Sequence, residues 1–278
     1  MKYINFRTKT MSGDIGLLFE NWTPGEERLA VFSPHDDDAV IGAGYAALAA
    51  MENGGEVFVV IFCNGDMGYS NPADKGKIAA LRRVETANCY RSMGVPEQNI
   101  LYMGYNDFSV WPFIGHGQPD GSEGATLKVM DLVRRHRITR VLLPNGWREH
   151  LDHEAVFRMG AYDAVQAGDR IGSHHGKPQV IKSYLQYSVW SDFSPEDSLM
   201  AGGGLRANRA VVVPESAEEK IGAALREYVS QGKIIEGLIT SRAERATRAG
   251  RMELYIALDP RPKLDFGPYR REIENLVK

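Results

Sequence analysis

Cysteine is scarce in this chain of 278 residues, which contains only Cys63 and Cys89. Two cysteines cannot form the disulfide framework of a small secreted protein, and a reducing compartment is the default for such a chain. Cys63 ends an apolar run and Cys89 lies within a helical pattern. Both are therefore expected to be small, buried hydrophobic residues rather than nucleophiles.

Long hydrophobic runs are also missing. The longest one, residues 57–63, is far too short to cross a bilayer. The N-terminal sequence MKYINFRTKTMSGD lacks the apolar stretch of a signal peptide. We therefore expect a cytoplasmic protein that has no membrane partner.

The sequence has no excess of positive charge. Its net charge is −3 and its isoelectric point is near 6.2, which disfavours a nucleic-acid partner. The densest basic run, residues 134–137, ends a helical pattern, where cations complement a helix C-terminus. The apolar fraction of 43% is sufficient for a sizeable core, and we expect residues 1–278 to form a single domain.

Strand and helix signals alternate through the first half of the chain. Strands are predicted at residues 29–32, 56–63, 100–103 and 138–143, and helices at 40–53, 77–93, 126–137 and 154–167. This alternation is typical of a parallel sheet with helices on both faces. The predicted fold is α/β, a Rossmann-like three-layer sandwich with a mostly parallel central sheet.

The second half is less regular, particularly from about residue 191. Strands are predicted at 180–190 and 210–213, and helices at 216–230 and 234–251. Two long loops, 104–125 and 191–208, are candidates for functional lids or walls. In the first loop, Tyr105, Trp111 and Phe113 would either form a wall for a sugar ring or anchor the loop.

A polar cluster follows the first predicted strand: His35, Asp36, Asp37 and Asp38. Ligands of open α/β sheets bind beyond the carboxyl ends of the strands, where this cluster is expected to lie. One aspartate could cap the following helix. Capping does not explain a histidine followed by three aspartates.

A second cluster, Trp147-Arg148-Glu149-His150-Leu151-Asp152-His153, follows the strand that ends at Leu143. The same edge of the sheet would present it, which favours a metal site shared by the two clusters. His35 and Asp38 are three residues apart, so a turn entering a helix can bring them to one side. His153 would complete a set of two histidines and one carboxylate, while Asp37 addresses a bound water. Zinc with three protein ligands keeps a position open for that water, and a nearby carboxylate can take its proton.

These two motifs resemble those of the PIG-L/LmbE-like family of metal-dependent N-deacetylases. That family carries His-Pro-Asp-Asp-Glu after its first strand and His-x-Asp-His further along the chain. The present sequence reads His-Asp-Asp-Asp-Ala at 35–39 and His-Leu-Asp-His at 150–153. Weaker similarities extend the resemblance from about residue 29 to 231, and they are Asn64-Gly65-Asp66, Arg82, Glu85, Gly104-Tyr105-Asn106-Asp107 and Ser230-Gln231.

The resemblance implies a zinc-dependent hydrolase that removes the N-acetyl group from an N-acetylglucosamine-type amino sugar or glycoside and releases acetate. It implies the following roles: metal ligands His35, Asp38 and His153, general base and acid Asp37, oxyanion-facing cation His150, tuning residue Asp152, and sugar-binding residues Arg82 and Asp107. Fe²⁺ or another divalent metal is an alternative to zinc. Family members often form trimers or hexamers, so a homo-oligomer is implied as well.

Two positions depart from the family pattern, because Asp36 replaces the usual proline and Ala39 replaces the usual glutamate. Neither position is a ligand in the family, so metal binding is expected to survive. Asp36 adds negative charge near the metal, and the loss of the glutamate changes the groups around the ligands. These changes affect substrate preference more than reaction type.

A dinucleotide-dependent oxidoreductase is the main alternative function. The segment Gly42-Ala43-Gly44 resembles a G-x-G-x-x-A fingerprint, and Asp66 follows it by about 20 residues. Such a fingerprint starts directly after a strand, whereas residues 35–38 interrupt the strand here. The glycines are therefore expected in the first helical turns, where they allow close packing on the sheet.

Two further alternatives are an iron(II) oxygenase and a non-catalytic sugar-binding module. Two histidines and a carboxylate also suit iron(II), but the α/β pattern disfavours an oxygenase. The presence of Asp37 disfavours pure binding, which needs no base. His174 and His175 lie in a loop rich in glycine, lysine and proline, and we expect both to be solvated.

Overall fold

The computed structural model describes residues 1–201 and 204–277, so Gly202 and Gly203 of the second long loop lie outside the described residues. The strands are β1 (Lys2–Asn5), β2 (Thr10–Ser12), β3 (Arg28–Ser33), β4 (Glu56–Cys63), β5 (Ile100–Tyr105), β6 (Arg140–Pro144), β7 (Ser183–Tyr187), β8 (Arg209–Val213), β9 (Ala246–Thr247) and β10 (Gly250–Leu258). The α-helices are α1 (Asp38–Glu52), α2 (Ile78–Met93), α3 (Ala125–Arg135), α4 (Leu151–Arg158), α5 (Pro195–Ala201), α6 (Glu215–Leu225), α7 (Gly232–Ser241) and α8 (Gly267–Leu276).

The strands form one sheet with the order β2-β1-β8-β10-β7-β6-β3-β4-β5, and β9 pairs with β10. Strands β3 to β7 pair in parallel. The other pairings, including that of β10 with β7, are antiparallel. The parallel arrangement expected from the first half is therefore present in one part of the sheet, and the sheet as a whole is mixed.

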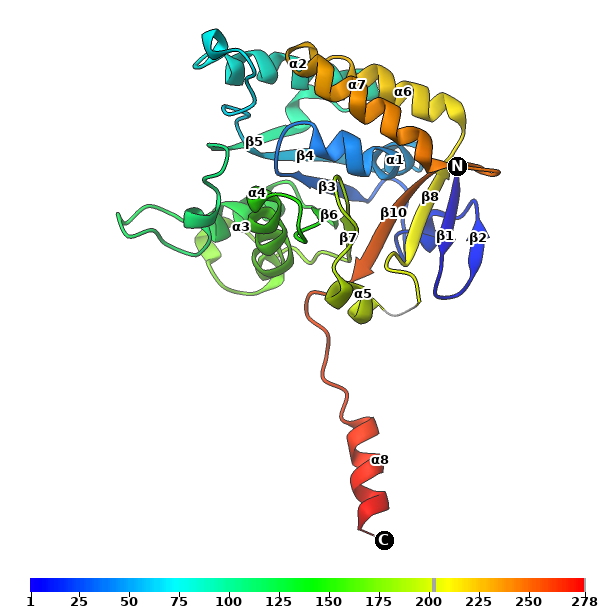
Figure 1. Cartoon of the computed structure of the whole chain (residues 1–278). Helices are drawn as coiled ribbons and strands as arrows, with labels where there is room; N and C mark the ends of the chain where they lie inside the picture. Colours follow the sequence, from blue (N-terminus) through cyan, green and yellow to red (C-terminus); the bar gives the residue numbers. More distant parts are fainter. Residues whose placement is uncertain (202–203, 278) are drawn as a thin grey trace.

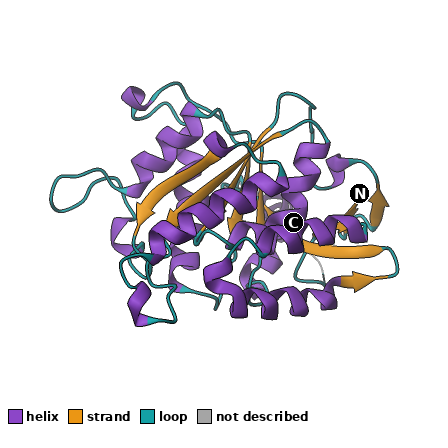
Figure 2. Cartoon of the chain, turned by 90° about the horizontal axis from the view of Figure 1, so that it is seen from above, coloured by secondary structure: helices purple, strands orange, loops and turns teal. Residues whose placement is uncertain are grey.

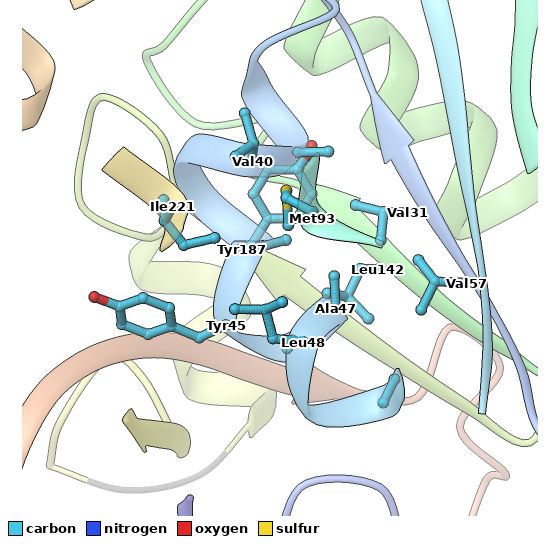
Figure 3. Packing of buried hydrophobic residues seen from close by; sticks show 14 of the residues in the cluster. Val31, Val40, Tyr45, Ala47, Leu48, Val57, Met93, Leu142, Tyr187 and Ile221 are labelled. Carbon is cyan, nitrogen blue, oxygen red and sulfur yellow. The ribbon is translucent and has the colours of Figure 1, made fainter. Parts of the chain in front are cut away.

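Helices cover both faces of the sheet (Figure 1). Successive residues of a strand point to opposite faces, so Val31 and Val57 join the core beneath α1 and α6, whereas Phe32 and Phe58 join the core beneath α3 and α4. Figure 2 shows the same layers from above. Side chains of α1 pack on those of β3, β4, β6 and β7 in the first core (Figure 3).

Glycine allows α1 to approach the sheet closely. A Cβ atom on Gly42 would collide with the Tyr187 ring and with the carbonyl oxygen of Ser188. A Cβ atom on Gly44 would lie 2.7 Å from Ile221 of α6. Both glycines lie inside the helix and not in a turn directly after a strand, as the sequence predicted. The segment therefore does not have the geometry of a dinucleotide phosphate-binding turn.

The helix predicted at residues 234–251 is wrong in its second half. Helix α7 ends at Ser241, and β10 begins at Gly250, whose φ of +133° is foreign to a helix. The charged residues of this segment suggest a solvated helix, but they have partners from distant parts of the fold. Arg245, for example, donates hydrogen bonds to Glu253 of β10 at 2.7 Å and to the carbonyl oxygen of Ile41 in α1 at 2.9 Å.

The strand order reverses where the two polar clusters lie. Beyond β3, the chain continues to β4 on one side of the sheet, while β6 pairs with β3 on the other side. In α/β sheets, ligands bind outside the carboxyl ends of the strands at such a reversal. Residues 34–38 follow β3 and residues 145–153 follow β6, so both clusters reach the same edge.

Candidate active site

The turn between β3 and α1 directs its consecutive aspartates to different partners. Asp36 is buried and accepts hydrogen bonds from the guanidinium group of Arg82. Asp38 is also buried and accepts a hydrogen bond from the backbone N–H of His35 at 2.8 Å. Asp37 occupies the N-cap position of α1, but its side chain makes no capping hydrogen bond. The Asp37 carboxylate is therefore not used to cap the helix and is available for other interactions.

His35, Asp38 and His153 come together, as the spacing of the two motifs predicts. Asp38 Oδ2 lies 3.2 Å from His35 Nδ1 and 3.0 Å from His153 Nε2. The potential ligand atoms of the three residues all lie within 4.8 Å of one another. Side chains separated by more than one hundred residues thus converge on one point.

This donor set fits a divalent metal. His153 Nε2 is buried and makes no hydrogen bond with the residues that the structure describes, although the Asp38 carboxylate lies 3.0 Å away. A cation bound between this nitrogen and the Asp38 carboxylate would take both groups as ligands. Two imidazoles and one carboxylate are typical of catalytic zinc sites with an open position, and they also suit iron(II).

Two other groups of potential ligands overlap this one through His35. One adds His150 and Asp152, and the other adds Cys63 and Asp107. Burial raises the pKa of Cys63 further above neutrality, which disfavours the thiolate that metal binding needs. Because His153 Nε2 is buried and makes no hydrogen bond, the set with Asp38 and His153 fits a metal best.

Charge interactions in the site are strong because water is largely excluded. Burial raises the pKa of Asp38, but the adjacent imidazoles outweigh burial and hold it well below its usual range. Burial lowers the pKa of His153, but the Asp38 carboxylate outweighs this effect and raises it to about 9. Burial raises the pKa of Asp37 to about 6 against the attraction of Arg82. Such a carboxyl group is suited to proton transfer near neutral pH.

Glu149 orients His153, a role that the sequence analysis did not assign. Its buried carboxylate lies 2.7 Å from His153 Nδ1. The other carboxylate oxygen accepts the backbone N–H groups of Val189, Trp190 and Ser191 at 3.0–3.2 Å. A carboxylate that binds Nδ1–H leaves the Nε2 lone pair free for a metal. The spacing of four residues between Glu149 and His153 was the available signal.

Asp152 contacts both neighbouring imidazoles and not only His150. Asp152 Oδ2 lies 3.4 Å from His35 Nε2 and 3.5 Å from His150 Nδ1. It also accepts a hydrogen bond from the backbone N–H of Phe108 at 2.7 Å. Phe108 adopts a φ of +60°, an unfavourable value for a bulky residue, which this contact helps to stabilise. Asp152 thereby links His35 to the loop after β5.

His150 is the N-cap residue of α4, and its Nδ1 accepts the backbone N–H of Asp152 at 3.1 Å. In the neutral ring the proton must then be on Nε2. Burial and the nearby His35 lower the pKa of His150. The lowered pKa favours a neutral ring, whereas the family resemblance implies a cation. A neutral His150 still offers an Nε2–H donor.

The two expected sugar-binding residues, Arg82 and Asp107, are both buried. Arg82 is buried by the segment that carries Gly65 and Gly68, and its guanidinium group is paired with Asp36. Asp107 accepts the backbone N–H groups of Gly65 and Met67 at 2.9 and 3.0 Å. In this structure both side chains therefore bind other residues of the protein around the site.

Of the expected aromatic wall, Tyr105 is buried and packs against Phe113 with ring centroids 4.9 Å apart, which anchors the loop. Phe108 was not singled out from the sequence. Its side chain is 57% exposed, and its ring centroid lies 4.4 Å from that of His150. Phe108 therefore offers an apolar surface next to the candidate catalytic groups.

Residues 30–164 match the PIG-L family model, which is described as GlcNAc-PI de-N-acetylase. The matched segment contains both polar clusters, and the resemblance to the PIG-L/LmbE-like family is confirmed. No curated protein matches the chain.

Several solved structures share the fold. The N,N'-diacetylchitobiose deacetylase from Pyrococcus horikoshii has a TM-score of 0.64 and 18% identity, with 84% of each chain covered. The 4-carboxy-2-hydroxymuconate hydratase GalB from Pseudomonas putida KT2440 has a TM-score of 0.63 and 18% identity, and covers 86% of this chain and 99% of its own. The zinc-inhibited form of the teicoplanin deacetylase Orf2 has a TM-score of 0.52 and 19% identity, with 83% and 97% covered.

Proposed function

Because residues 30–164 match the PIG-L family model, we propose that the chain is a metal-dependent N-deacetylase. Its substrate would be an N-acetylglucosamine-type amino sugar or glycoside, and its products acetate and the free amine. The observation that carries the proposal is the convergence of His35, Asp38 and His153, whose potential ligand atoms all lie within 4.8 Å of one another. The uncapped carboxylate of Asp37 lies beside this cluster.

A divalent cation held by these three residues would polarise the amide carbonyl and lower the pKa of a water molecule to about 7. Asp37 accepts a proton from the attacking water and then donates one to the leaving amine. The Nε2–H of His150 donates a hydrogen bond to the negative oxygen of the tetrahedral intermediate. A preorganised donor of this kind is worth roughly 3 kcal/mol.

Within the proposal, Phe108 contacts the sugar ring. A pyranose presents an apolar face, which exposed aromatic rings bind well. Arg82 acts on the catalytic carboxylate, because its guanidinium group lies 3.5 Å from Asp37 Oδ2 and attracts it. Asp107 acts indirectly by holding residues 65–67. In this proposal Arg82 and Asp107 do not contact the sugar. They hold other residues of the site in place instead.

The proposal includes the metal, the fold description and the number of domains. We favour zinc as the metal because of the ligand set, although the teicoplanin deacetylase has a zinc-inhibited form, so Fe²⁺ should be compared. The order β5-β4-β3-β6-β7 supports describing the parallel part as Rossmann-like. One sheet spans both halves, which supports a single domain over residues 1–278.

A cytoplasmic location and a homo-oligomer remain part of the proposal as well. The structure contains two free, buried cysteines, in keeping with a reducing compartment. None of the described helices is both long and apolar enough to cross a membrane.

The Asp37→Asn variant tests the reaction directly. Loss of the proton-transfer group should lower kcat for acetate release by about 10²–10⁴-fold, while the metal content per chain stays unchanged. The readout is acetate release from a panel of N-acetylated sugars and glycosides, together with elemental analysis. Asp120→Asn, which replaces an exposed carboxylate in the hairpin at residues 117–123, is the matched control.

Wild-type turnover in Asp37→Asn would refute the assignment of the base. The likeness to GalB shows that the fold also occurs in a hydratase. If no member of the panel released acetate while a carbon–carbon double bond was hydrated, the deacetylase proposal would be wrong.

A further inference from the structure

A second group of potential metal ligands lies outside the candidate active site and shares no residue with it. Glu123, His174 and His175 place one potential ligand atom each within 4.8 Å of the others. The sequence predicted that both histidines would be solvated. The structure differs for His175, because only 10% of its side chain is exposed.

His175 has a buried ring nitrogen with nothing to bind. Its Nε2 lacks a hydrogen-bond partner within residues 1–201 and 204–277. The nearest carboxylate oxygen, Glu123 Oε1, is 3.7 Å away, which is too far for a hydrogen bond. An unsatisfied buried nitrogen costs about 1–3 kcal/mol, so the fold gains if a ligand occupies this point.

The segment that carries the two histidines is held firmly. The buried Arg134 of α3 donates hydrogen bonds to the backbone carbonyls of Ala167, Asp169, Ile171 and Gly172 at 2.7–3.0 Å. The His175 backbone N–H also donates to Gly172 O at 3.0 Å. The rings of His174 and His175 lie side by side, with centroids 4.1 Å apart.

Glu123 comes from the loop between β5 and α3, which projects from the body of the protein (Figure 1). Here the chain forms a small hairpin in which Glu123 pairs with Gly117. The neighbouring Gly124 N–H donates to His116 O at 2.9 Å, and Gln118 N–H donates to Ser122 O at 2.8 Å. The backbone of Glu123 is therefore also held in place before a ligand binds.

We propose that Glu123, His174 and His175 bind a divalent transition metal, preferably Zn²⁺, at a site distinct from the candidate active site. Around a tetrahedral zinc with bonds of about 2.1 Å, ligand atoms lie roughly 3.4 Å apart. The separation of 3.7 Å between Glu123 and His175 is close to this value. The side chains of Glu123 and His174 are exposed and can adjust by rotation.

The proposed metal would connect two loops. Glu123 lies near the C-terminal end of the loop at residues 106–124, and Phe108 lies near its N-terminal end. Phe108 donates its backbone N–H to Asp152, and its ring packs on that of His150. A metal at this site would connect the C-terminal end of this loop to residues 169–175. The expected effect is a more stable loop beside the candidate active site.

Elemental analysis after equilibrium dialysis against buffered free Zn²⁺ tests the proposal. We expect Glu123→Gln and His174→Gln each to bind one zinc fewer per chain than the wild type. Both side chains are exposed, so neither substitution should prevent folding. His116→Gln, in the same hairpin but outside the group of ligands, should bind as much zinc as the wild type.

The comparison is a difference between variants, so it holds whether or not the active-site cluster also binds zinc. Zinc should also raise the Tm of the wild type more than that of Glu123→Gln. Equal zinc content in the wild type, Glu123→Gln and His174→Gln would overturn the proposal. A lower Tm of Glu123→Gln without any loss of zinc would show a simple ion pair with His175 and would overturn it as well.

Discussion

At the scale of single residues, Glu149 decides which nitrogen of His153 faces the candidate metal. Its carboxylate requires a proton on Nδ1 and so leaves Nε2 as a lone pair. In Glu149→Gln, an amide N–H can face Nδ1 and favour a proton on Nε2. We therefore expect metal affinity to fall by about 10–100-fold, measured by competition with a chelator.

Glu154→Gln is the matched control for Glu149→Gln. Glu154 also lies close to His153, but its side chain is 40% exposed and pairs only loosely with Arg158 at 3.7 Å. Its substitution should leave the metal affinity unchanged. If Glu149→Gln bound metal as tightly as the wild type, Glu149 would serve only to hold the turn at residues 188–191.

At the scale of elements, the packing of α1 on the sheet depends on the absence of a side chain at Gly42. In Gly42→Ala the added Cβ atom meets the Tyr187 ring and the Ser188 carbonyl group, and neither can move far. Overpacking of this kind costs typically 1–3 kcal/mol of unfolding free energy. Chemical denaturation of the purified variant measures the loss.

Gly237→Ala gives the opposite expectation on another helix. Gly237 lies within α7, and no atom is within 4 Å of the position of an added Cβ. Alanine is the better helix former, so the substitution should stabilise the protein by about 0.5–1 kcal/mol. Equal effects of the two substitutions would mean that close packing does not explain Gly42.

At the scale of the whole molecule, Glu27 joins the strand ends opposite the candidate active site. Its buried carboxylate accepts hydrogen bonds from Arg140 at 3.0 Å and from Lys182 at 2.8 Å. Burial raises the pKa of Glu27, but these cations outweigh it and lower the pKa to about 2. Because the folded state binds the proton more weakly, this contribution to stability is present above about pH 4.5 and is lost as the pH falls towards 2.

Glu27→Gln should therefore lose about 3–5 kcal/mol of unfolding free energy at pH 7, because two cations are left without their anion. The difference from the wild type should shrink as the pH is lowered from 4.5 to 2. Denaturation measured across this range tests both statements. Glu97→Gln, which breaks an exposed pair with Arg91, should change stability by less than about 1 kcal/mol at every pH.

The C-terminal helix α8 projects away from the body of the protein (Figure 1), and none of its residues is buried. Truncation after Lys263 should therefore change the unfolding free energy by no more than about 0.5 kcal/mol. A much larger loss would show that α8 packs against another surface in solution, such as a second copy of the chain.

Local patterns were sufficient to predict much of the first half of the fold. The predicted strand at residues 56–63 coincides with β4. The helix predicted at residues 77–93 ends with α2 at Met93, and the next residue, Gly94, adopts a φ of +100°. The antiparallel part was harder to predict. Strand β10 is rich in charge at its start, and its buried Glu253 accepts hydrogen bonds from Arg245 and Tyr255.

The sequence by itself determined that two polar clusters end neighbouring strands, because parallel strands present their carboxyl ends at the same edge. It therefore predicted that His35, Asp38 and His153 would meet. Only the tertiary structure decided which partners the remaining polar groups have. Asp36 binds Arg82 from 46 residues away, and Glu149 binds backbone N–H groups some 40 residues away. Such pairings depend on which groups burial brings together, and no local pattern in the chain encodes them.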